Sequence, residues 1–313
     1  MTSTRNSFTI VMASAVFMVL APSAWGQAID LPSIVTGIHG PNTWMGVNYT
    51  HQFEADVDNS TAEMDRDSVQ AVVGHRFEVG DSVFLVGNLS YQGSYYDFSN
   101  GNDRSQLLWD NIHEATLMLG VGWRAGENWT LVALGLGQTS GESGADFGDT
   151  LTGGVALAVD YKWSERLSTG ALLGVQSQLE DSAAIIPVPT IDWRFADGWL
   201  FHLGLVRLAY TGVGPEISYR SERWQFAVGG SYQTRRYRLD DRPGPTNEGI
   251  GQETSFPIFV RTAFSPNKNM NFGLMAGVSF GGELRSGADG GSKVFKDDYD
   301  PAPFIGLQAN FWF

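Results

Sequence analysis

Hydrophobic and polar residues alternate along most of the chain after residue 42. Between Leu151 and Trp163, nearly every second residue is large and hydrophobic, and the residues between them are polar or small. Successive side chains of a β-strand point to opposite faces, so this alternation predicts strands with one apolar face. Runs of this kind lie at residues 43–55, 67–79, 82–97, 112–125, 128–139, 150–164, 166–180, 185–196, 199–210, 213–221, 223–238, 254–265, 269–282 and 303–313.

Three of these runs are weak. The runs 128–139 and 199–210 do not alternate cleanly. The run 185–196 contains Pro187 and Pro189, which cannot donate to the hydrogen bonds of a strand ladder. We therefore expect about fourteen strands, with twelve as the alternative.

The connections between the runs alternate between short and long. Short turns such as Gly80-Asp81 and Gly126-Glu127 are followed by longer polar links such as 98–111 and 283–302. Membrane-spanning barrels show this asymmetry, with tight turns on the periplasmic side and longer loops outside. The pattern predicts an all-β fold, a closed antiparallel up-and-down transmembrane β-barrel with both chain ends on the periplasmic side.

Tryptophans lie near the predicted short turns. Indole rings prefer the headgroup boundary of a bilayer, whereas tryptophans in the core of a soluble sandwich would lie in the middle of strands. We therefore expect a girdle of tryptophans at the membrane interface. The predicted girdle consists of Trp123, Trp129, Trp163, Trp193, Trp199, Trp224 and Trp312.

The first residues have the pattern of a secretory signal peptide. Arg5 is the only charge before Asp30, and it precedes an apolar run from Phe8 to Ala21. That run is shorter than the roughly 20 residues of a membrane-spanning helix. The expected division of the chain is a cleaved signal peptide at residues 1–26, a short periplasmic segment or hatch at residues 27–42, and the barrel at residues 43–313.

Composition narrows the class of partner. The net charge of −14 disfavours nucleic acids, since their phosphates would be repelled. The chain has no cysteine, and its five histidines show no metal-ligand spacing, so we expect no metal and no cofactor. After the predicted signal, no run approaches the roughly 18 apolar residues of a transmembrane helix.

The polar faces of the predicted strands carry charges of both signs. In a membrane barrel these faces line the lumen, where a charge is tolerated if it faces water or a counter-charge. We expect a wet, narrow lumen crossed by carboxylate–guanidinium pairs, which either stiffen the wall or select solutes. The predicted lumen-lining charges are Arg76, Glu78, Arg124, Asp160, Lys162, Asp192, Arg194, Glu216, Arg220, Arg235 and Arg261.

No catalytic motif stands out in the sequence. A Gly-x-Ser-x-Gly elbow is missing, and so is a His-Glu-x-x-His zinc motif. His113-Glu114, at the start of a strand beside a long loop, is the one pair worth considering for catalysis. We therefore expect that the protein is not an enzyme and that it has no catalytic residues.

Two charged clusters lie beside predicted long loops. Asp297-Asp298-Tyr299-Asp300 is expected to be a solvated acidic loop, or to bridge divalent ions to lipopolysaccharide phosphates. The run Arg235-Arg236-Tyr237-Arg238 either pairs with the neighbouring Asp240 and Asp241 or binds anionic lipid headgroups.

The last strand resembles the C-terminal strand of bacterial outer-membrane barrels. Ile305, Leu307, Ala309, Phe311 and Phe313 share one face, and Phe313 is the final residue. The chain as a whole is similar to uncharacterised outer-membrane barrel families of environmental bacteria. This resemblance implies a location in the outer membrane among its lipids and lipopolysaccharide. It also implies escort by periplasmic chaperones and recognition of Phe311 and Phe313 by the barrel-assembly machinery.

These observations lead to three expected functions. The first is a channel or passive transporter for small solutes through a charged, narrow lumen. The alternative is a structural or surface-interaction barrel without transport. An outer-membrane hydrolase comes third, because the sequence supplies only His113-Glu114 for it.

Overall fold

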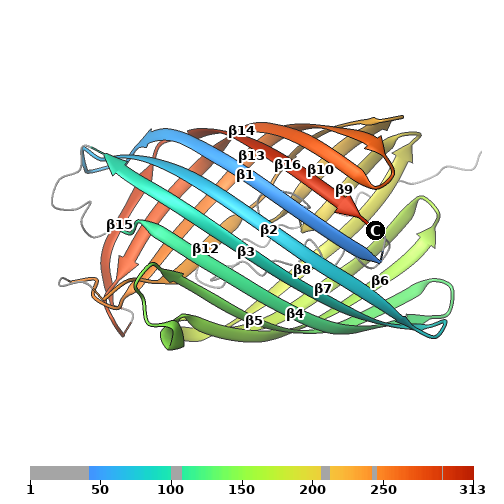
Figure 1. The fold of residues 1–313 in the computed structure, drawn as a ribbon, viewed down its shortest axis with the longest axis horizontal. Helices are drawn as coiled ribbons and strands as arrows, with labels where there is room; N and C mark the ends of the chain where they lie inside the picture. Colours follow the sequence, from blue (N-terminus) through green and yellow to red (C-terminus); the bar gives the residue numbers. More distant parts are fainter. Residues whose placement is uncertain (1–41, 100–107, 206–211, 242–244, 291) are drawn as a thin grey trace, which may run out of the picture.

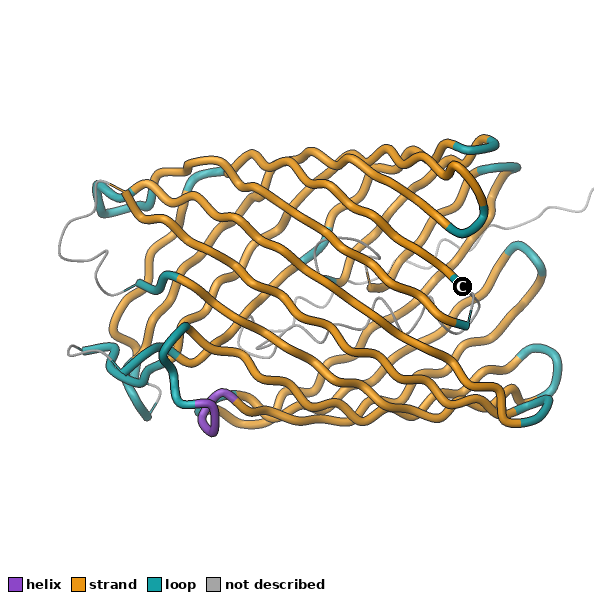
Figure 2. The backbone as a smooth tube through the Cα atoms, viewed as in Figure 1, coloured by secondary structure: helices purple, strands orange, loops and turns teal. Residues whose placement is uncertain are grey.

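A single antiparallel sheet closes on itself to form a barrel (Figures 1 and 2). The computed structural model describes residues 42–99, 108–205, 212–241, 245–290 and 292–313, so the predicted signal peptide and hatch lie outside the described residues. The strands are β1 (Thr43–Asp56), β2 (Glu63–Val79), β3 (Val83–Ser99), β4 (Asn111–Ala125), β5 (Trp129–Glu142), β6 (Leu151–Ser164), β7 (Leu167–Gln178), β8 (Asp181–Ala196), β9 (Trp199–Leu205), β10 (Val213–Ser221), β11 (Trp224–Gly230), β12 (Gln233–Arg238), β13 (Ile250–Asn267), β14 (Met270–Gly287), β15 (Lys293–Tyr299) and β16 (Ala302–Trp312).

These sixteen segments form fourteen barrel strands. The segments β11 and β12 follow each other along the chain, and both pair with β13. In the same way β15 and β16 both pair with β14. The barrel closes between β1 and β16, where Trp44 lies opposite Trp312 and Gln52 lies opposite Phe304. The predicted fold class and the strand count of fourteen are confirmed.

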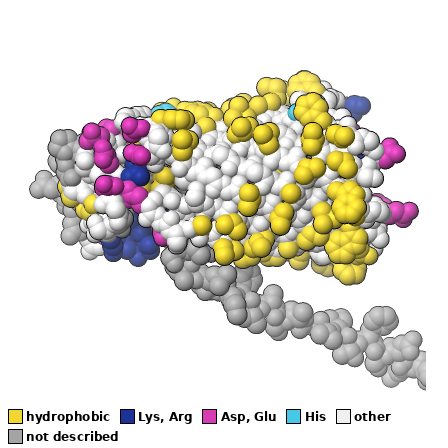
Figure 3. Space-filling view, turned by 90° about the horizontal axis from the view of Figure 1, so that it is seen from below, with side chains coloured by type: hydrophobic (Ala, Val, Ile, Leu, Met, Phe, Trp, Pro, Cys, Tyr) yellow, Lys and Arg dark blue, Asp and Glu magenta, His cyan; other side chains and the backbone are white. Residues whose placement is uncertain are grey.

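Alternation along each strand separates an outer face from an inner face. In β1, Met45, Val47 and Tyr49 are exposed on the outside, whereas Asn48 and Thr50 between them are buried inside. Hydrophobic side chains cover the side of the barrel, and charged side chains gather at its two ends (Figure 3). A closed sheet satisfies every backbone donor and acceptor of its strands, as a lipid environment requires.

The two ends of the barrel differ in their connections. We call them the short-turn end, where β2 meets β3 and β4 meets β5, and the long-loop end. Several links expected to be loops are largely strand: within 283–302, β14 continues to Gly287 and β15 begins at Lys293. A 3-10 helix, Phe147–Thr150, caps the link between β5 and β6. No helix in the described part of the chain is long and apolar enough to cross a membrane.

The two prolines of β8 lie on an incompletely paired stretch. Ladder pairs between β8 and β9 run from Ile191 to Ala196 on the β8 side. From Ala184 to Thr190, β8 pairs with β7 alone among the described residues. A strand that needs no donors on one side accepts proline, so Pro187 and Pro189 fit in this wall.

The core of the protein lies inside the barrel and has three parts, the smallest of which consists of Phe259, Met275 and Phe304 on β13, β14 and β16. At the long-loop end, inner side chains of β1, β2, β3, β12, β14 and β15 form a buried cluster, here called the long-loop core; its members include Met64, Tyr96, Trp109, Ile112, Tyr237, Leu284 and Tyr299. A second cluster, here called the apolar wall, follows the inner faces of β3 to β8. It contains Trp44, Phe84, Val86, Met118, Val132, Leu134, Leu136, Ala156, Leu172, Ala184, Ile186, Val188 and Leu205.

Candidate functional site

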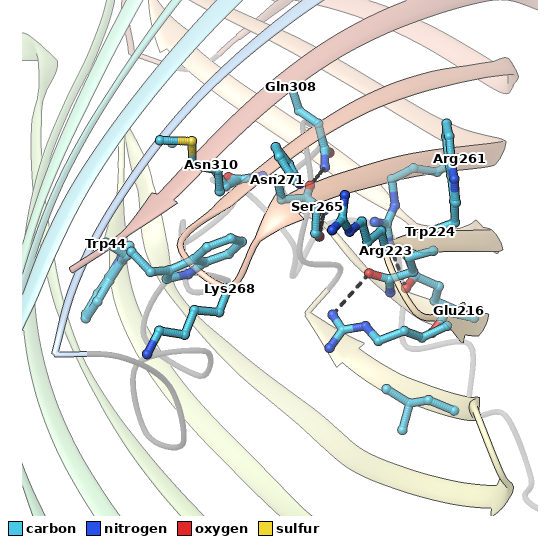
Figure 4. Close-up of a pocket in the computed structure, with 18 of the residues that line it drawn as sticks. Trp44, Glu216, Arg223, Trp224, Arg261, Ser265, Lys268, Asn271, Gln308 and Asn310 are labelled. Atoms are coloured by element: carbon cyan, nitrogen blue, oxygen red, sulfur yellow. Dashed lines mark hydrogen bonds and ion pairs between the residues drawn. The ribbon is translucent and has the colours of Figure 1, made fainter.

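A cavity of about 1050 Å³ occupies the short-turn end of the lumen (Figure 4). Its lining comes from β1, β2, β8, β9, β10, β11, β13, β14 and β16 and from the turns that join them. We call this space the short-turn cavity.

Hydrogen-bonded side chains form the polar side of the short-turn cavity. The Asn48 amide donates to Gln70 at 3.0 Å, and the Gln308 amide donates to Asn271 at 3.1 Å. Deeper in the lumen, the Arg261 guanidinium donates to the Glu216 carboxylate at 2.9 Å. Both partners of this ion pair are nearly buried, with side-chain exposures of 6% and 10%.

Aromatic side chains form another side of the cavity. The indole of Trp44 lies over Gly74 of the neighbouring strand, where an added Cβ would lie 2.1 Å from the ring. The same arrangement recurs at Gly122, where the ring of Phe84 occupies the place of a side chain. Glycine on an inner face therefore lets a large ring lie flat against the wall. Trp44 belongs to the apolar wall, and Trp312 packs against it.

The apolar wall corrects one expectation from the sequence. We predicted that the polar faces of the strands line the lumen, yet the inward residues of β5 include Val132, Leu134 and Leu136. Inward residues of β8 include Ile186 and Val188. The lumen thus has an apolar wall along β3 to β8 and, around the short-turn cavity, a polar wall formed by β1, β10, β13, β14 and β16. The buried side chains of Phe259, Met275 and Phe304 form a smaller apolar patch on this second side.

Ion pairs across the lumen tie the long-loop core together. The Arg66 guanidinium on β2 donates to Glu253 on β13 at 2.6 Å. Tyr299 also donates to the Glu253 carboxylate, at 3.1 Å. Arg235 on β12 forms an ion pair with Glu114 on β4. These contacts join opposite sides of the barrel, and they narrow the lumen at the long-loop end.

Tightly packed rings complete the long-loop core. Trp109 has no exposed surface, and its ring lies 4.9 Å from that of Tyr237, edge to face. The segment β12 bends across the lumen far enough for Arg238 to pair with Gly141 of β5. Side chains from opposite walls therefore meet at this end, whereas the short-turn end holds the cavity.

The eleven predicted lumen charges lie at three heights. Near the short turns, Arg124 binds both oxygens of Glu78 at 2.9 Å, and Lys162 donates to Glu165 at 2.6 Å. This hydrogen bond lowers the pKa of the Glu165 carboxyl, which lies in a turn outside the strands. The short-turn level holds Arg76, Glu78, Arg124, Asp160, Lys162, Asp192, Arg194 and Arg220; the ion pair Glu216–Arg261 lies deeper, and Arg235 lies in the long-loop core.

The tryptophans predicted to form the girdle divide into two groups. Six of them lie on the outer surface, with exposed fractions from 41% to 64%: Trp123, Trp129, Trp163, Trp193, Trp199 and Trp224. Trp312 differs, because it packs against the apolar wall inside the barrel. Its even position on β16 places it in the same phase as the inward Phe304 and Gln308. Phe313 is exposed at the end of this strand.

The histidine considered for catalysis faces away from its acidic neighbour. His113 lies on the outer surface, where Nδ1 is 2.7 Å from the Tyr91 hydroxyl and Nε2 is 3.0 Å from Ser143 Oγ. Glu114 points into the lumen and binds Arg235. Adjacent strand residues lie on opposite faces, so the two cannot act on one substrate. Among the described residues, no group of His, Cys, Asp and Glu is placed to hold a metal ion.

The two charged clusters have partners that differ from those expected. The predicted pairing with Asp240 and Asp241 is wrong for Arg235, which pairs with Glu114, and for Arg238, which pairs with Glu180 in the turn between β7 and β8. The acidic cluster lies at the end of β15 and not in a loop; Asp298 and Asp300 are exposed to solvent, as expected, but Asp297 is not. Asp297 is buried on β15, where it accepts a hydrogen bond from Asn59 at 2.8 Å.

Sequence reasoning missed two important features of the lumen. One is the contact between Arg66 and Glu253, and the other is the apolar wall. Nothing in the sequence marks Glu253 as the partner of Arg66, which lies 187 residues away. A signal for the apolar wall was present, because the run 128–139 is hydrophobic on both faces and therefore failed to alternate cleanly. A strand that is apolar on both faces is expected where the lumen is apolar as well.

Comparison with known proteins supports the fold. The TodX monoaromatic hydrocarbon channel, in its deltaS2 mutant form, is similar with a TM-score of 0.51 at 8% identity, over 93% of this chain and 96% of that one. The COG4313 outer membrane channel from Pseudomonas putida F1 has a TM-score of 0.49 at 11% identity, over 87% and 96%. These identities are low, so the likeness concerns the fold, and it confirms the resemblance to outer-membrane barrels. No curated protein matches the chain. Residues 81–313 match the family described as "Domain of unknown function (DUF6268)", and the chain belongs to this family.

Proposed function

We propose that the protein is an outer-membrane channel for small solutes that have an apolar and a polar part. The observation that carries the proposal is the divided lumen, in which a cavity of about 1050 Å³ adjoins both the apolar wall and a polar wall. Trp44 of the apolar wall lines the cavity together with Val72 and Leu200, and apolar surface that faced only water there would cost free energy. The name of the TodX monoaromatic hydrocarbon channel agrees with the apolar part of such a solute and does not bear on the polar part.

The proposal includes an orientation and a set of partners. Short turns face the periplasm in barrels of this type, so the short-turn cavity opens toward the periplasm and the long loops face outward. The outer surface of the barrel contacts membrane lipid and, at the long-loop end, lipopolysaccharide. Periplasmic chaperones and the barrel-assembly machinery deliver the chain to the membrane, with Phe311 and Phe313 as the recognised end.

The long-loop core favours a second candidate, a structural barrel without transport. Its members Trp109, Tyr237 and Leu284 are fully buried, as in the core of a soluble protein. In a channel this core is the narrowest part of the path, and it has to open or leave a gap for solutes. In a structural barrel it is a permanent stiffener. A hydrolase has less support, since His113 and Glu114 lie on opposite faces.

Conductance of the purified protein, refolded into planar bilayers, separates the two candidates. A channel gives discrete current steps, and Trp109→Ala enlarges them several-fold, because the substitution removes a fully buried indole from the long-loop core. The matched control is Trp163→Ala on the outer surface, which leaves the step size unchanged. If the protein and the Trp109→Ala variant are both electrically silent, the channel proposal is wrong and the structural barrel stands.

A further inference from the structure

We propose that the short-turn cavity is a binding site for small monocarboxylates that have an apolar body. The inference rests on the proposed function and names the class of solute that the channel handles. Three features of the cavity carry it: an excess of positive charge, buried donors without acceptors, and an apolar side continuous with the apolar wall.

The cavity is positively charged although the protein is acidic. Five cationic side chains line it and two carboxylates oppose them, a difference of three positive charges, whereas the whole chain carries −14. Of the two carboxylates, Glu216 is neutralised by Arg261. A cavity lined by one sign of charge raises the local concentration of ions of the opposite sign. The cations are Arg194, Arg220, Arg223, Arg261 and Lys268.

Most of these cations have no carboxylate partner within the described part of the chain. Arg223 and Lys268 form no ion pair there, and Arg220 has only a 3.5 Å contact with the Gln225 amide. Arg194 donates to the backbone carbonyl of Glu165 at 2.9 Å. Guanidinium groups bind carboxylates through two parallel hydrogen bonds, so such groups favour an anion with a planar pair of oxygens.

Two donors deeper in the cavity point to an acceptor on the ligand. Nε of Arg261 and Nε1 of Trp44 have no hydrogen-bond partner among the described residues, although both residues are more than nine-tenths buried. Buried donors are ordinarily satisfied, because an unsatisfied donor has lost its hydrogen bonds to water without replacing them. A bound carboxylate, or water that it brings, would supply the acceptor.

The apolar side of the cavity selects the body of the ligand. Trp44, Val72, Leu200 and Trp312 line it, and Trp44 continues into the apolar wall. Burial of apolar surface stabilises by about 25 cal/mol per Å², so an aromatic ring gains affinity here that a hydrated inorganic anion does not. The smallest probe that combines a carboxylate with such a body is benzoate.

Calorimetric titration of the full chain in nanodiscs, with empty nanodiscs as the blank, tests the site. Benzoate is expected to bind at least tenfold more tightly than benzyl alcohol, which has the same ring without the charge. The double variant Arg223→Gln/Lys268→Gln is expected to weaken benzoate at least tenfold. The matched control is Arg166→Gln, which removes a charge from another short turn outside the cavity and leaves binding unchanged.

Four results would overturn the proposal. Equal binding of benzoate and benzyl alcohol would show that the carboxylate does not contribute to binding. Equal losses of benzoate affinity in the control and in the double variant would show that only the overall charge of the protein matters. If glucuronate binds as tightly as benzoate, the cavity does not select for an apolar body, because glucuronate carries hydroxyl groups in its place. Conductance is scored separately: a conducting protein that binds no benzoate disproves the site alone, and a silent protein that binds it disproves the channel alone.

Discussion

The long-loop core and the short-turn cavity use the same kinds of residue in opposite ways. In the core, Arg66 and Arg235 are buried, and each has a carboxylate within ion-pair distance. In the cavity, Arg223 and Lys268 line open space without a carboxylate partner among the described residues. The two regions lie in one barrel, less than the length of a strand apart.

This difference separates charges that hold the barrel together from charges that are free to meet a ligand. A buried cation without its counter-charge is costly, so the pairs of the core are needed for folding. A cation beside a water-filled cavity keeps much of its solvation, and its contribution to stability is small. Substitutions in the two regions should therefore affect different properties, stability in the core and binding in the cavity.

The largest loss of stability is expected for Glu253→Gln. The substitution removes the carboxylate that binds Arg66 at 2.6 Å and accepts from Tyr299, and it takes this counter-charge away from a buried guanidinium. The free energy of unfolding should fall by about 3–5 kcal/mol. Guanidinium titration of the chain refolded into lipid vesicles, followed by tryptophan fluorescence, measures it.

The control for Glu253→Gln is Glu222→Gln. Glu222 lies in the exposed turn between β10 and β11, so its loss should change the free energy of unfolding by less than about 0.5 kcal/mol. If the two variants lose equal stability, the distinction between the core and the cavity fails.

An intermediate loss is expected for Arg261→Gln, at the boundary between the two regions. Glu216 would keep its burial and lose its only ion-pair partner among the described residues. Because the pair borders the cavity, water can reach the remaining carboxylate, and we expect a loss of about 1.5–3 kcal/mol. The same titration measures it, and a loss as large as that of Glu253→Gln would show that the cavity does not admit water.

Among the predicted losses of stability, the smallest is expected for Trp163→Ala on the outer surface; only the control Glu222→Gln should change stability less. The indole lies 4.7 Å from the ring of Tyr161 and donates to Thr169 at 2.8 Å. Losing this ring pair should lower the free energy of unfolding in vesicles by about 0.5–1.5 kcal/mol. Trp312→Ala is the comparison, because its ring packs inside the barrel; a smaller loss for Trp312 than for Trp163 would contradict this placement.

Much of the barrel could be predicted before its structure was known. The alternation from Leu151 to Trp163 and the in-phase short turns identify strands, their inner and outer faces, and a closed sheet. The runs that alternated poorly were informative for a different reason. In the run 128–139 both faces are apolar because the inner one belongs to the apolar wall. In the run 185–196 the prolines lie where β8 pairs with β7 alone among the described residues.

The candidate site was less accessible to such reasoning. Glu216 and Arg261 were both predicted to face the lumen, but their 2.9 Å contact follows from the register of three strands. Arg223 and Lys268 lie in short turns, where a sequence shows only a surface charge. They line the cavity because two turns of the closed barrel come together at its rim.

By itself, the sequence determined which side of the sheet each strand residue occupies, because the two-residue period of a strand is a local property of the backbone. Only the tertiary structure decided which inward residues meet across the lumen. The meeting of Arg66 with Glu253, or of Trp109 with Tyr237, depends on the height and angular position of each strand in the closed barrel. Closure and shear set those positions, and they are properties of the whole sheet that no single strand encodes.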